Sequence, residues 1–508
     1  MEPIFKMNPN TFLPLTVPGN NEIRELLQKR VDRQKQAIGI VVGVVEPAGR
    51  RVIAYGNLAN ADTRILDGDT IFEIGSVTKV FTSLLLADMM NRKEVALDDP
   101  AAKYLPDNVS LPERNGKFIT LIDLATHRSG LPPLPGNQKP DAEYGVEDLY
   151  QFLSGYTLPR DPGSEYEYSN LGAGLLAHIL ARRARTDYGS LIRTRITQLL
   201  NMPDTGVTLS PSMKQRMSAG HNTMLTPVAN SDLPAPLAGA GALRSSANDM
   251  LKFLEAFLGY RESSLTPSMK AMLEVRRPAG QTEIGLGWLI YPTDGREIIW
   301  HNGKTAGFYS FVGYDPITRV GVVVLSNATR SGVDDIGFHL LNPKLPLANP
   351  EPPAQHIEIP IDPALIDNYT GRYQVTPNLI FEITRDGDRL FAQGFAQLPH
   401  NPPGNPTGLP KFELFAEGEK EFFARVSDSR ITFETRPEGR ATSLILTKAT
   451  AICTPRDCPD YRSGSARCSR NLAGLEDRAS LWRYGVSGDE RTPAVLDNAG
   501  LRSRKCAG

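Results

Sequence analysis

Residues 73–82 read EIGSVTKVFT and place Ser76 three positions before Lys79, at the start of an apolar run. Residues three apart on a helix share a face, so the hydroxyl and the amine can meet there. A serine hydroxyl attacks efficiently only when a neighbouring base removes its proton, and Lys79 is placed to do this. Gly75 lets the chain turn tightly and puts Ser76 at a helix N-terminus, which stabilises negative charge. The alternative is a serine N-cap followed by a solvated lysine.

Residues 162–170 read PGSEYEYSN and place Tyr168 and Asn170 directly before an apolar helix. From positions two apart on a loop, their side chains can point the same way, the tyrosine as proton acceptor and donor and the asparagine as an amide anchor. The alternative is a turn with an N-cap at Asn170. The segment therefore offers partners of the kind that a nucleophile at Ser76 requires.

Residues 299–308 read IWHNGKTAGF, with His301 and Gly303 at the end of a predicted strand. A glycine there would let a substrate lie against the strand edge, with the following N–H directed at an oxyanion. The alternative is an ordinary strand end in which Gly303 forms a bulge.

The composition is that of an ordinary globular protein. The chain has 508 residues, of which 40% are hydrophobic and 22% charged, and its formal net charge is −1. This length predicts two or three domains, and the charge gives no reason to expect nucleic acid or an anionic membrane as a partner. No apolar run reaches the ~18–20 residues that span a bilayer. Residues 1–17 show no signal peptide, which predicts a cytoplasmic protein, or a periplasmic or secreted one if a signal was removed.

The cysteines all follow residue 450, at Cys453, Cys458, Cys468 and Cys506. The main body is therefore expected to form without disulfides or thiolate metal sites. The seven histidines are scattered and show no zinc-binding spacing. We expect neither a metal nor a cofactor.

The order of sequence patterns predicts an α/β body. Residues 38–56 contain two β-branched runs around a Pro-Ala-Gly turn, which predicts a hairpin. Helical patterns begin near Ser76 and cover residues 145–154, 170–183, 189–200 and 246–258, and residues 297–326 return to a strand pattern. Strands at both ends with helices between them predict that the terminal segments meet in one antiparallel sheet.

The remainder of the chain differs from this body, which we place at residues 1–341. Residues 342–360 are rich in proline and predict an extended, semi-rigid linker. Residues 361–450 show short segments of period two with tight turns, which predict a small all-β barrel or sandwich. Residues 451–508 are rich in Arg, Ser and Gly with little periodicity, and predict a disordered tail.

The motifs GSVTK, YSN and HNG, in this order, resemble the motifs of the serine β-lactamase and penicillin-binding-protein superfamily. The likeness is to its class C-like branch, which includes class C β-lactamases, D-Ala-D-Ala carboxypeptidases, D-aminopeptidases and family VIII carboxylesterases. Segments such as ITLIDLATHRSGLP and PGSEYEYSNLGAGLL also match this branch, and the resemblance covers about residues 20–340. It implies an antiparallel sheet flanked by helices, with an all-α region. The C-terminal β segment resembles the lipocalin-like domain of some members.

The resemblance also implies a role for each motif residue. Ser76 would be the acylated nucleophile and Lys79 its proton partner, while Tyr168 would relay the proton to the leaving group and activate the deacylating water. Asn170 would orient the substrate and Lys79. The backbone N–H groups of Ser76 and Lys304 would form the oxyanion hole. The aligned triplet His301, Asn302 and Gly303 would bind the substrate.

This triplet departs from the pattern of the class C β-lactamases, which usually carry Lys-Thr-Gly. The Lys304-Thr305 pair does not restore it, because aligning that pair would displace Gly307 and Phe308 from their matching places. A histidine, with an ordinary pKa of ~6.5, is mostly neutral at pH 7 and offers a hydrogen bond more than a charge. We therefore expect a serine hydrolase acting on small molecules or short peptides: β-lactams, D-amino-acid amides or peptides, or small esters. The alternatives are a carboxylesterase with little β-lactamase activity and an inactive binding or scaffold protein.

Other residues carry weaker signals. An α/β-hydrolase Gly-x-Ser-x-Gly elbow is absent from the sequence. Residues 239–241 read Gly-Ala-Gly and predict a tight turn lining the site. His127 is expected to be a hydrogen-bonded structural residue. Trp288 is expected either to line the cleft or to belong to the core.

Overall fold

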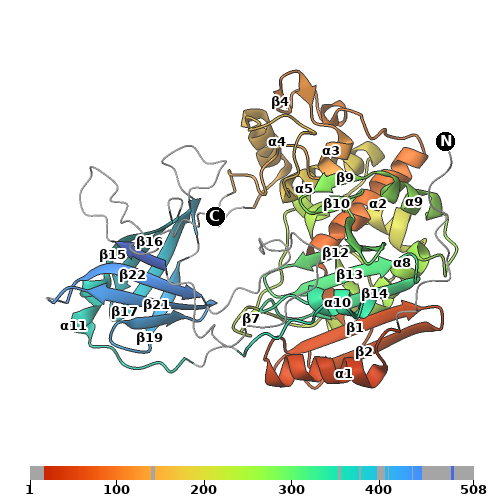
Figure 1. The fold of residues 1–508 in the computed structure, drawn as a ribbon. Helices are drawn as coiled ribbons and strands as arrows, with labels where there is room; N and C mark the ends of the chain where they lie inside the picture. Colours follow the sequence, from red (N-terminus) through yellow and green to blue (C-terminus); the bar gives the residue numbers. More distant parts are fainter. Residues whose placement is uncertain are drawn as a thin grey trace, which may run out of the picture. The chain divides into compact units, whose positions relative to one another are not determined.

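The computed structural model describes residues 16–138, 143–352, 356–376, 379–396, 407–409, 411–437, 439–448 and 482–485. The chain divides into two compact units, residues 1–352 and 353–508 (Figure 1). Each unit is described separately below. Apart from residues 482–485, the predicted tail at 451–508 lies outside the described residues.

The main sheet of the first unit has the strand order β2-β1-β14-β13-β12-β11-β10-β9. Its strands are β1 (Gly39–Glu46), β2 (Gly49–Gly56), β9 (Arg277–Ala279), β10 (Thr282–Ile284), β11 (Leu289–Thr293), β12 (Arg296–Lys304), β13 (Tyr309–Asp315) and β14 (Val320–Ser326). β1 and β2 form the predicted hairpin, with Glu46 opposite Gly49. β1 also pairs antiparallel with β14, with Ile40 opposite Ser326. The prediction that both ends of the body meet in one sheet is therefore confirmed.

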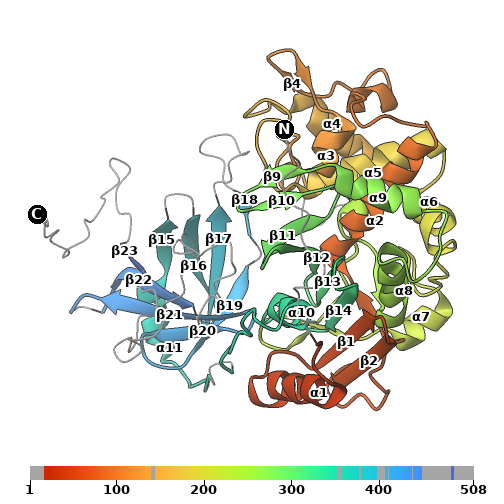
Figure 2. The same ribbon diagram turned by 45° about the vertical axis from the view of Figure 1, so that its right-hand side comes forward.

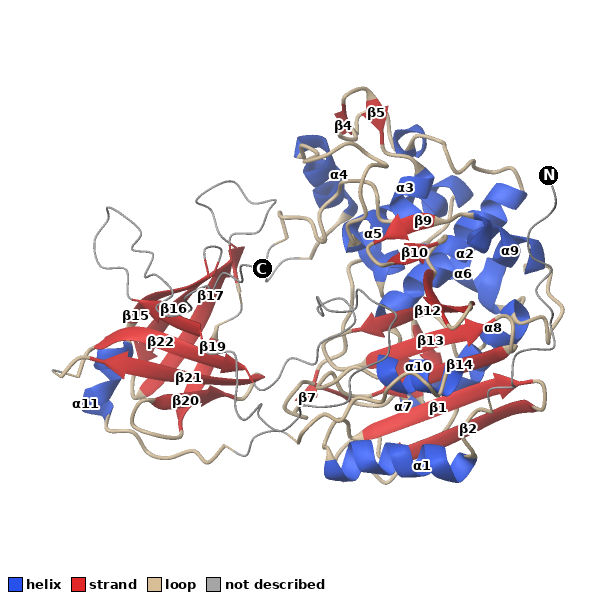
Figure 3. Ribbon diagram, in the orientation of Figure 1, coloured by secondary structure: helices blue, strands red, loops and turns tan. Residues whose placement is uncertain are grey.

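Helices cover both faces of this sheet (Figure 3). Val41 and Val45 of β1 belong to the hydrophobic cluster that contains α2 and α8, whereas Val42 and Val44 belong to the cluster that contains α1 and α10. A strand buried on both faces reads as a continuous apolar run, which explains why β1 shows no alternation.

The helices of the first unit are α1 (Asn20–Gln28), α2 (Thr78–Asn91), α3 (Leu121–Ala125), α4 (Val146–Gly155), α5 (Asn170–Ala184), α6 (Tyr188–Ile192), α7 (Pro211–Arg216), α8 (Ala247–Phe257), α9 (Thr266–Glu274) and α10 (Asp334–Leu341). Short 3₁₀ turns cover Gly75–Val77, Ala101–Tyr104 and Ala235–Ala240, and π turns extend α1 and α6 over Lys29–Arg33 and Arg193–Thr197. Across the described ranges, every helix is too short or too polar to span a bilayer.

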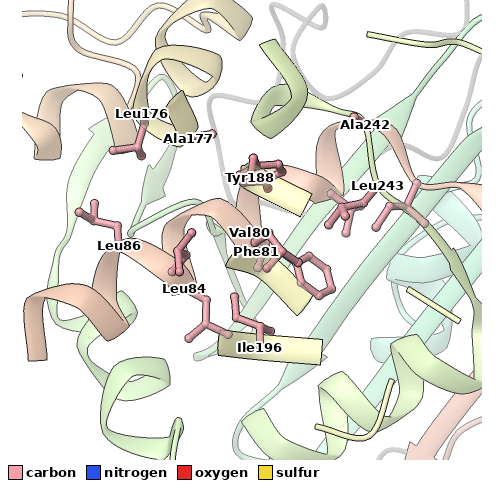
Figure 4. Packing of buried hydrophobic residues seen from close by; sticks show 14 of the residues in the cluster. Val80, Phe81, Leu84, Leu86, Leu176, Ala177, Tyr188, Ile196, Ala242 and Leu243 are labelled. Carbon is pink, nitrogen blue, oxygen red and sulfur yellow. The ribbon is translucent and has the colours of Figure 1, made fainter. Parts of the chain in front are cut away.

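Helix α2 runs through the core of the first unit and is buried from Thr78 to Met89. A helix that is apolar on all sides is stable only when other elements surround it. Its neighbours include α5, α6, α9, the π turn that follows α6 and the 3₁₀ turn at Ala235–Ala240. Figure 4 shows the packing of Val80, Phe81, Leu84, Leu86, Leu176, Ala177, Tyr188, Ile196, Ala242 and Leu243.

Short strand pairs complete the first unit: β3 (Ile71–Glu73) with β8 (Arg244–Ser246), β4 (Glu113–Arg114) with β5 (Lys117–Phe118), and β6 (Gly220–His221) with β7 (Pro227–Val228). The β3–β8 pair bears on function, because β3 leads into the segment that carries Ser76. The Ile74 N–H donates to the Leu243 carbonyl, 3.1 Å away, and so extends this anchorage up to the candidate nucleophile.

The first part of the proline-rich segment is hydrogen-bonded to the first unit and is not a free linker. The Arg30 guanidinium donates to the Ala348 carbonyl (3.0 Å), and the Gln34 amide donates to Asn349 Oδ1 (2.9 Å). Residues 342–352 therefore belong to the first unit. The prolines indicate extended backbone, but they do not indicate the surface against which that backbone lies.

The second unit is a nearly closed antiparallel barrel, with the strand order β15-β16-β17-β19-β20-β21-β22-β23 and with β15 lying beside β22 and β23 (Figure 2). Its elements are α11 (Pro363–Ile366), a 3₁₀ turn at Asp367–Tyr369, β15 (Gly371–Thr376), β16 (Leu379–Asp386), β17 (Arg389–Ala396), β18 (Thr407–Gly408), β19 (Phe412–Ala416), β20 (Glu421–Ala424), β21 (Ser427–Thr435), β22 (Ala441–Lys448) and β23 (Trp482–Gly485). Tyr373, Phe422 and Phe433 pack in its interior. The predicted fold class, an α/β body with a small β barrel, is confirmed. β23 differs from the prediction, because it pairs with β22 although it falls within the predicted tail.

Candidate active site

Ser76 lies in the 3₁₀ turn that leads directly into α2. Gly75, just before it, has a φ of +49°, and a Cβ at Gly75 would lie 2.8 Å from the backbone nitrogen of Lys304. Glycine is suited to both the left-handed conformation and the close approach. The turn therefore places Ser76 beside the end of β12, where the sequence predicts an oxyanion hole.

Lys79 is buried in the first turn of α2, with 2% of its surface exposed. Its Nζ lies 2.9 Å from Ser76 Oγ, 2.7 Å from Asn170 Oδ1 and 2.6 Å from the Ala240 carbonyl oxygen. Burial lowers the pKa of Lys79 well below its ordinary value, because loss of solvent disfavours the charged ammonium. The alternative of a solvated lysine is wrong.

These contacts favour an ordered proton path once Lys79 is neutral. The oxygens of Asn170 and Ala240 only accept, so they take the two N–H bonds of a neutral amine. The amine lone pair is then left for the hydroxyl proton of Ser76. The Tyr168 hydroxyl donates to Ser76 Oγ from 2.7 Å. The protons thus point from Tyr168 to Ser76 and from Ser76 to Lys79.

Tyr168 and Asn170 reach this cluster from the start of α5. Ser169 is the N-cap, because its Oγ accepts from the Gly172 N–H at 2.8 Å. The alternative of an N-cap at Asn170 is therefore wrong, and the Asn170 amide is directed to Lys79 instead. The Tyr168 ring also lies against Lys79, with Nζ 4.8 Å from the ring centroid.

β12 presents its candidate residues on opposite faces, since side chains alternate along a strand. A Cβ at Gly303 would lie 1.9 Å from the Ile74 carbonyl oxygen. The face of β12 that carries His301 and Gly303 therefore turns toward the segment that leads to Ser76. His301 is 2% exposed, and its Nδ1 lies 2.6 Å from the Asn302 carbonyl oxygen.

The opposite face of β12 carries Asn302 and Lys304. The Asn302 amide donates to Asp334 Oδ2 at 2.6 Å and to the Tyr309 hydroxyl at 3.2 Å, on the side of α10. The structure therefore does not bring the Asn302 side chain to Ser76. It brings the Lys304 backbone there, next to Gly75.

The structure adds Ala240 to the residues that the sequence predicts. Its carbonyl accepts from Lys79, and the preceding Gly239 carbonyl accepts from Thr82 Oγ1 at 2.9 Å. The Gly-Ala-Gly stretch does lie at the site, but a backbone carbonyl has no signature of its own in a sequence. Trp288 belongs to the core, where it is fully buried. His127 accepts a hydrogen bond from the Ser169 N–H at Nδ1.

Comparisons with known proteins agree with this geometry. A family model described as "Beta-lactamase" matches residues 23–340, and one described as "Domain of unknown function (DUF3471)" matches residues 355–457. The chain is 31% identical over 341 residues to the D-alanyl-D-alanine-carboxypeptidase/endopeptidase AmpH of Escherichia coli, a match that covers 62% of this chain and 87% of that protein. It is 26% identical over 426 residues to penicillin-binding protein 4* of Bacillus subtilis, covering 77% of this chain and 89% of that protein. Among solved structures, the class C beta-lactamase of Rhodobacter sphaeroides superposes with a TM-score of 0.54 at 27% identity, covering 61% of this chain and 93% of that one.

The family match spans more than half of the chain. This protein therefore belongs to the beta-lactamase family and is a serine hydrolase of that family.

Proposed function

We propose that this protein hydrolyses acyl substrates through a covalent acyl-enzyme on Ser76. The observation that carries the proposal is the hydrogen-bonded cluster in which Ser76 Oγ lies 2.9 Å from Lys79 Nζ and 2.7 Å from the Tyr168 hydroxyl. Acyl transfer by serine requires a base for the nucleophile and a proton donor for the leaving group, and the buried amine of Lys79 and the hydroxyl of Tyr168 are suited to these roles.

In acylation, Ser76 Oγ bonds to the substrate carbonyl carbon as its proton passes to neutral Lys79. The N–H groups of Ser76 and Lys304 stabilise the oxyanion that forms. When the scissile bond breaks, Tyr168 donates a proton to the leaving amine or alkoxide and recovers one from Lys79. In deacylation, Tyr168 takes a proton from the attacking water as it passes its own proton to neutral Lys79. The bond between the acyl carbon and Ser76 Oγ then breaks, Ser76 Oγ takes the proton back from Lys79, and the acid product leaves.

The preferred substrates are short D-amino-acid peptides or amides and small uncharged esters. Peptides are supported by the likeness to the carboxypeptidase/endopeptidase of E. coli, which is 31% identical. Esters are a second candidate, supported by His301, which puts a buried imidazole where a lysine would give a permanent positive charge for a substrate carboxylate. Carboxylate-bearing β-lactams are therefore expected to be hydrolysed more slowly than small uncharged esters.

Turnover of a substrate panel tests this proposal: nitrocefin, p-nitrophenyl butyrate and a D-Ala-D-Ala peptide, each with wild type and with Ser76→Ala. We expect hydrolysis of the ester at a higher kcat/KM than that of nitrocefin, and no hydrolysis of any of the three substrates with Ser76→Ala. Efficient nitrocefin turnover would contradict the proposed preference. Activity of Ser76→Ala equal to wild type would contradict the mechanism.

A further inference from the structure

His127 contacts Tyr168 and both of its chain neighbours. The Glu167 N–H donates to the His127 carbonyl at 2.8 Å, and the Ser169 N–H donates to His127 Nδ1 at 3.2 Å. Between these hydrogen bonds, the imidazole packs on the Tyr168 ring, with 4.4 Å between centroids and 35° between planes. One residue therefore holds the segment that carries the candidate proton carrier.

The backbone of His127 is in an unfavourable conformation for a residue of its size. Its φ is +55°, in the left-handed region, and 3% of its surface is exposed. Such a conformation is strained for a residue with a bulky side chain, whereas glycine would adopt it without strain. A glycine would, however, supply neither the ring nor the Nδ1 acceptor. The strain is tolerated at a position where the side chain makes contacts that glycine cannot.

The residues around His127 fix it in turn. Thr126 Oγ1 donates to the Ile122 carbonyl of α3 at 2.6 Å. The Arg128 guanidinium donates to the carbonyls of Gly163 and Ser164, at 3.1 Å and 2.9 Å, and so ties residues 126–128 to the loop that leads to Tyr168. His127 is thus a rigid support for that loop.

We propose that His127 is a positioning residue that holds the Tyr168 hydroxyl at Ser76. This inference rests on the proposed function, because it matters only if Tyr168 carries a proton in the reaction. His127 contacts Tyr168 and its chain neighbours, and we assign its effect on the reaction to these contacts. Misplacing a reacting group by about 1 Å can cost ~10²-fold in rate.

The chain offers a matched control in a second His–Tyr pair. The Tyr150 hydroxyl lies 2.7 Å from His178 Nε2, and the rings meet at 5.5 Å and 69°. This pair joins α4 to the middle of α5, about two helical turns beyond Asn170. His178→Asn therefore removes a comparable contact without acting on Tyr168.

A double-mutant cycle between His127 and Tyr168 tests the proposal. His127→Phe keeps a ring but removes the Nδ1 acceptor, and Tyr168→Phe removes the hydroxyl. The readout is kcat/KM for p-nitrophenyl butyrate, with active sites counted by fluorophosphonate labelling. We expect His127→Phe to lower kcat/KM by about 10- to 100-fold in the wild-type background. In the Tyr168→Phe background, the same substitution should lower kcat/KM by less than about twofold. His178→Asn should stay within about twofold of wild type.

His127→Asn provides a second variant if His127→Phe folds poorly, because asparagine tolerates the left-handed backbone and keeps an acceptor. The decrease in kcat/KM caused by His127→Asn should be smaller than that caused by His127→Phe. It should also disappear in the Tyr168→Phe background. Equal losses in both backgrounds, or no loss in the wild-type background, would overturn the inference and leave the proposed function intact. A wild-type chain that is neither labelled at Ser76 nor active would overturn both.

Discussion

The helical side and the strand side of the candidate active site are built in different ways. On the helical side, Lys79 of α2 and Tyr168, two residues before α5, form hydrogen bonds with Ser76. Asn170, the first residue of α5, contacts Lys79. On the strand side, β12 contributes close backbone contacts at Gly303 and Lys304. In the mechanism proposed above, the helical side carries the proton transfers, whereas the strand side supplies one oxyanion-hole N–H, shapes the site and selects the substrate. Changes on the first side should lower the rate for every substrate.

Lys79→Arg should have the largest effect among the variants that keep Ser76. A guanidinium stays protonated, so it cannot take the proton of Ser76, and general-base assistance is typically worth ~10²–10⁴-fold. We expect a loss of this size in kcat/KM for the ester and the peptide alike. A loss for one substrate class only would place substrate selection, rather than chemistry, on the helical side.

The pH profile sharpens this prediction. Burial lowers the pKa of Lys79, so its neutral form is present at a lower pH than for a free lysine. Wild-type kcat/KM should rise with pH as Lys79 loses its proton and should level off well below the ordinary lysine pKa of ~10.4. Lys79→Arg should show no such rise. A wild-type rise centred on the ordinary lysine value would contradict the lowered pKa.

Gly303→Ala should have the next largest effect on kcat/KM, because it changes the shape of the strand side of the site. A Cβ there would lie 1.9 Å from the Ile74 carbonyl oxygen, so β12 or the nucleophile segment must shift. We expect kcat/KM to fall by about 10- to 100-fold, together with a lower melting temperature. Gly155→Ala is the matched control, because a Cβ at Gly155 meets nothing within 4 Å. Unchanged activity in Gly303→Ala would show that the strand side does not constrain Ser76.

His301→Lys should change preference more than rate. A lysine would add a cation for substrate carboxylates, and we expect the ratio of nitrocefin to ester kcat/KM to rise by about tenfold, equivalent to about 1.4 kcal/mol. His301→Gln is the control, since it adds hydrogen-bonding groups without a charge. If both variants raise the ratio equally, charge at position 301 is not what selects the substrate.

The smallest effect is expected from shortening the segment after α10, which lies outside both the helical and the strand side of the site. A chain ending at residue 352 keeps the contacts of Arg30 and Gln34 with Ala348 and Asn349, whereas a chain ending at residue 345 loses them. Each hydrogen bond that is lost costs about 0.5–1.5 kcal/mol. The shorter chain should melt several degrees lower by differential scanning calorimetry. Equal melting temperatures would show that residues 346–352 contribute nothing to the first unit.

Much of the helical side could be predicted from the sequence, because its residues lie on regular elements. The spacing of Ser76 and Lys79 on one helix face brought them within hydrogen-bond reach, and the apolar run after them became the buried helix α2. The hairpin and the pairing of β1 with β14 followed from β-branched runs at both ends of the body.

Other features depend on tertiary contacts that no local pattern encodes. Ser169 and Asn170 are both good N-cap residues, and the contact of Asn170 with Lys79 separates their roles. The Ala240 carbonyl is a backbone group, and Asp334, which accepts from Asn302, lies 32 residues further along the chain. The positive φ of His127 has no local signature such as a glycine, and its packing on Tyr168 is a tertiary contact.

The assignment of Ser76 as the nucleophile is tested most directly by locating the covalent adduct. Wild type and Ser76→Ala are incubated with a fluorophosphonate and, separately, with a fluorescent penicillin, and the digested protein is analysed by tandem mass spectrometry. We predict a single adduct in wild type, on the hydroxyl of Ser76, and none in Ser76→Ala. An adduct on another residue, or equal labelling of both proteins, would contradict the assignment of Ser76 as the nucleophile.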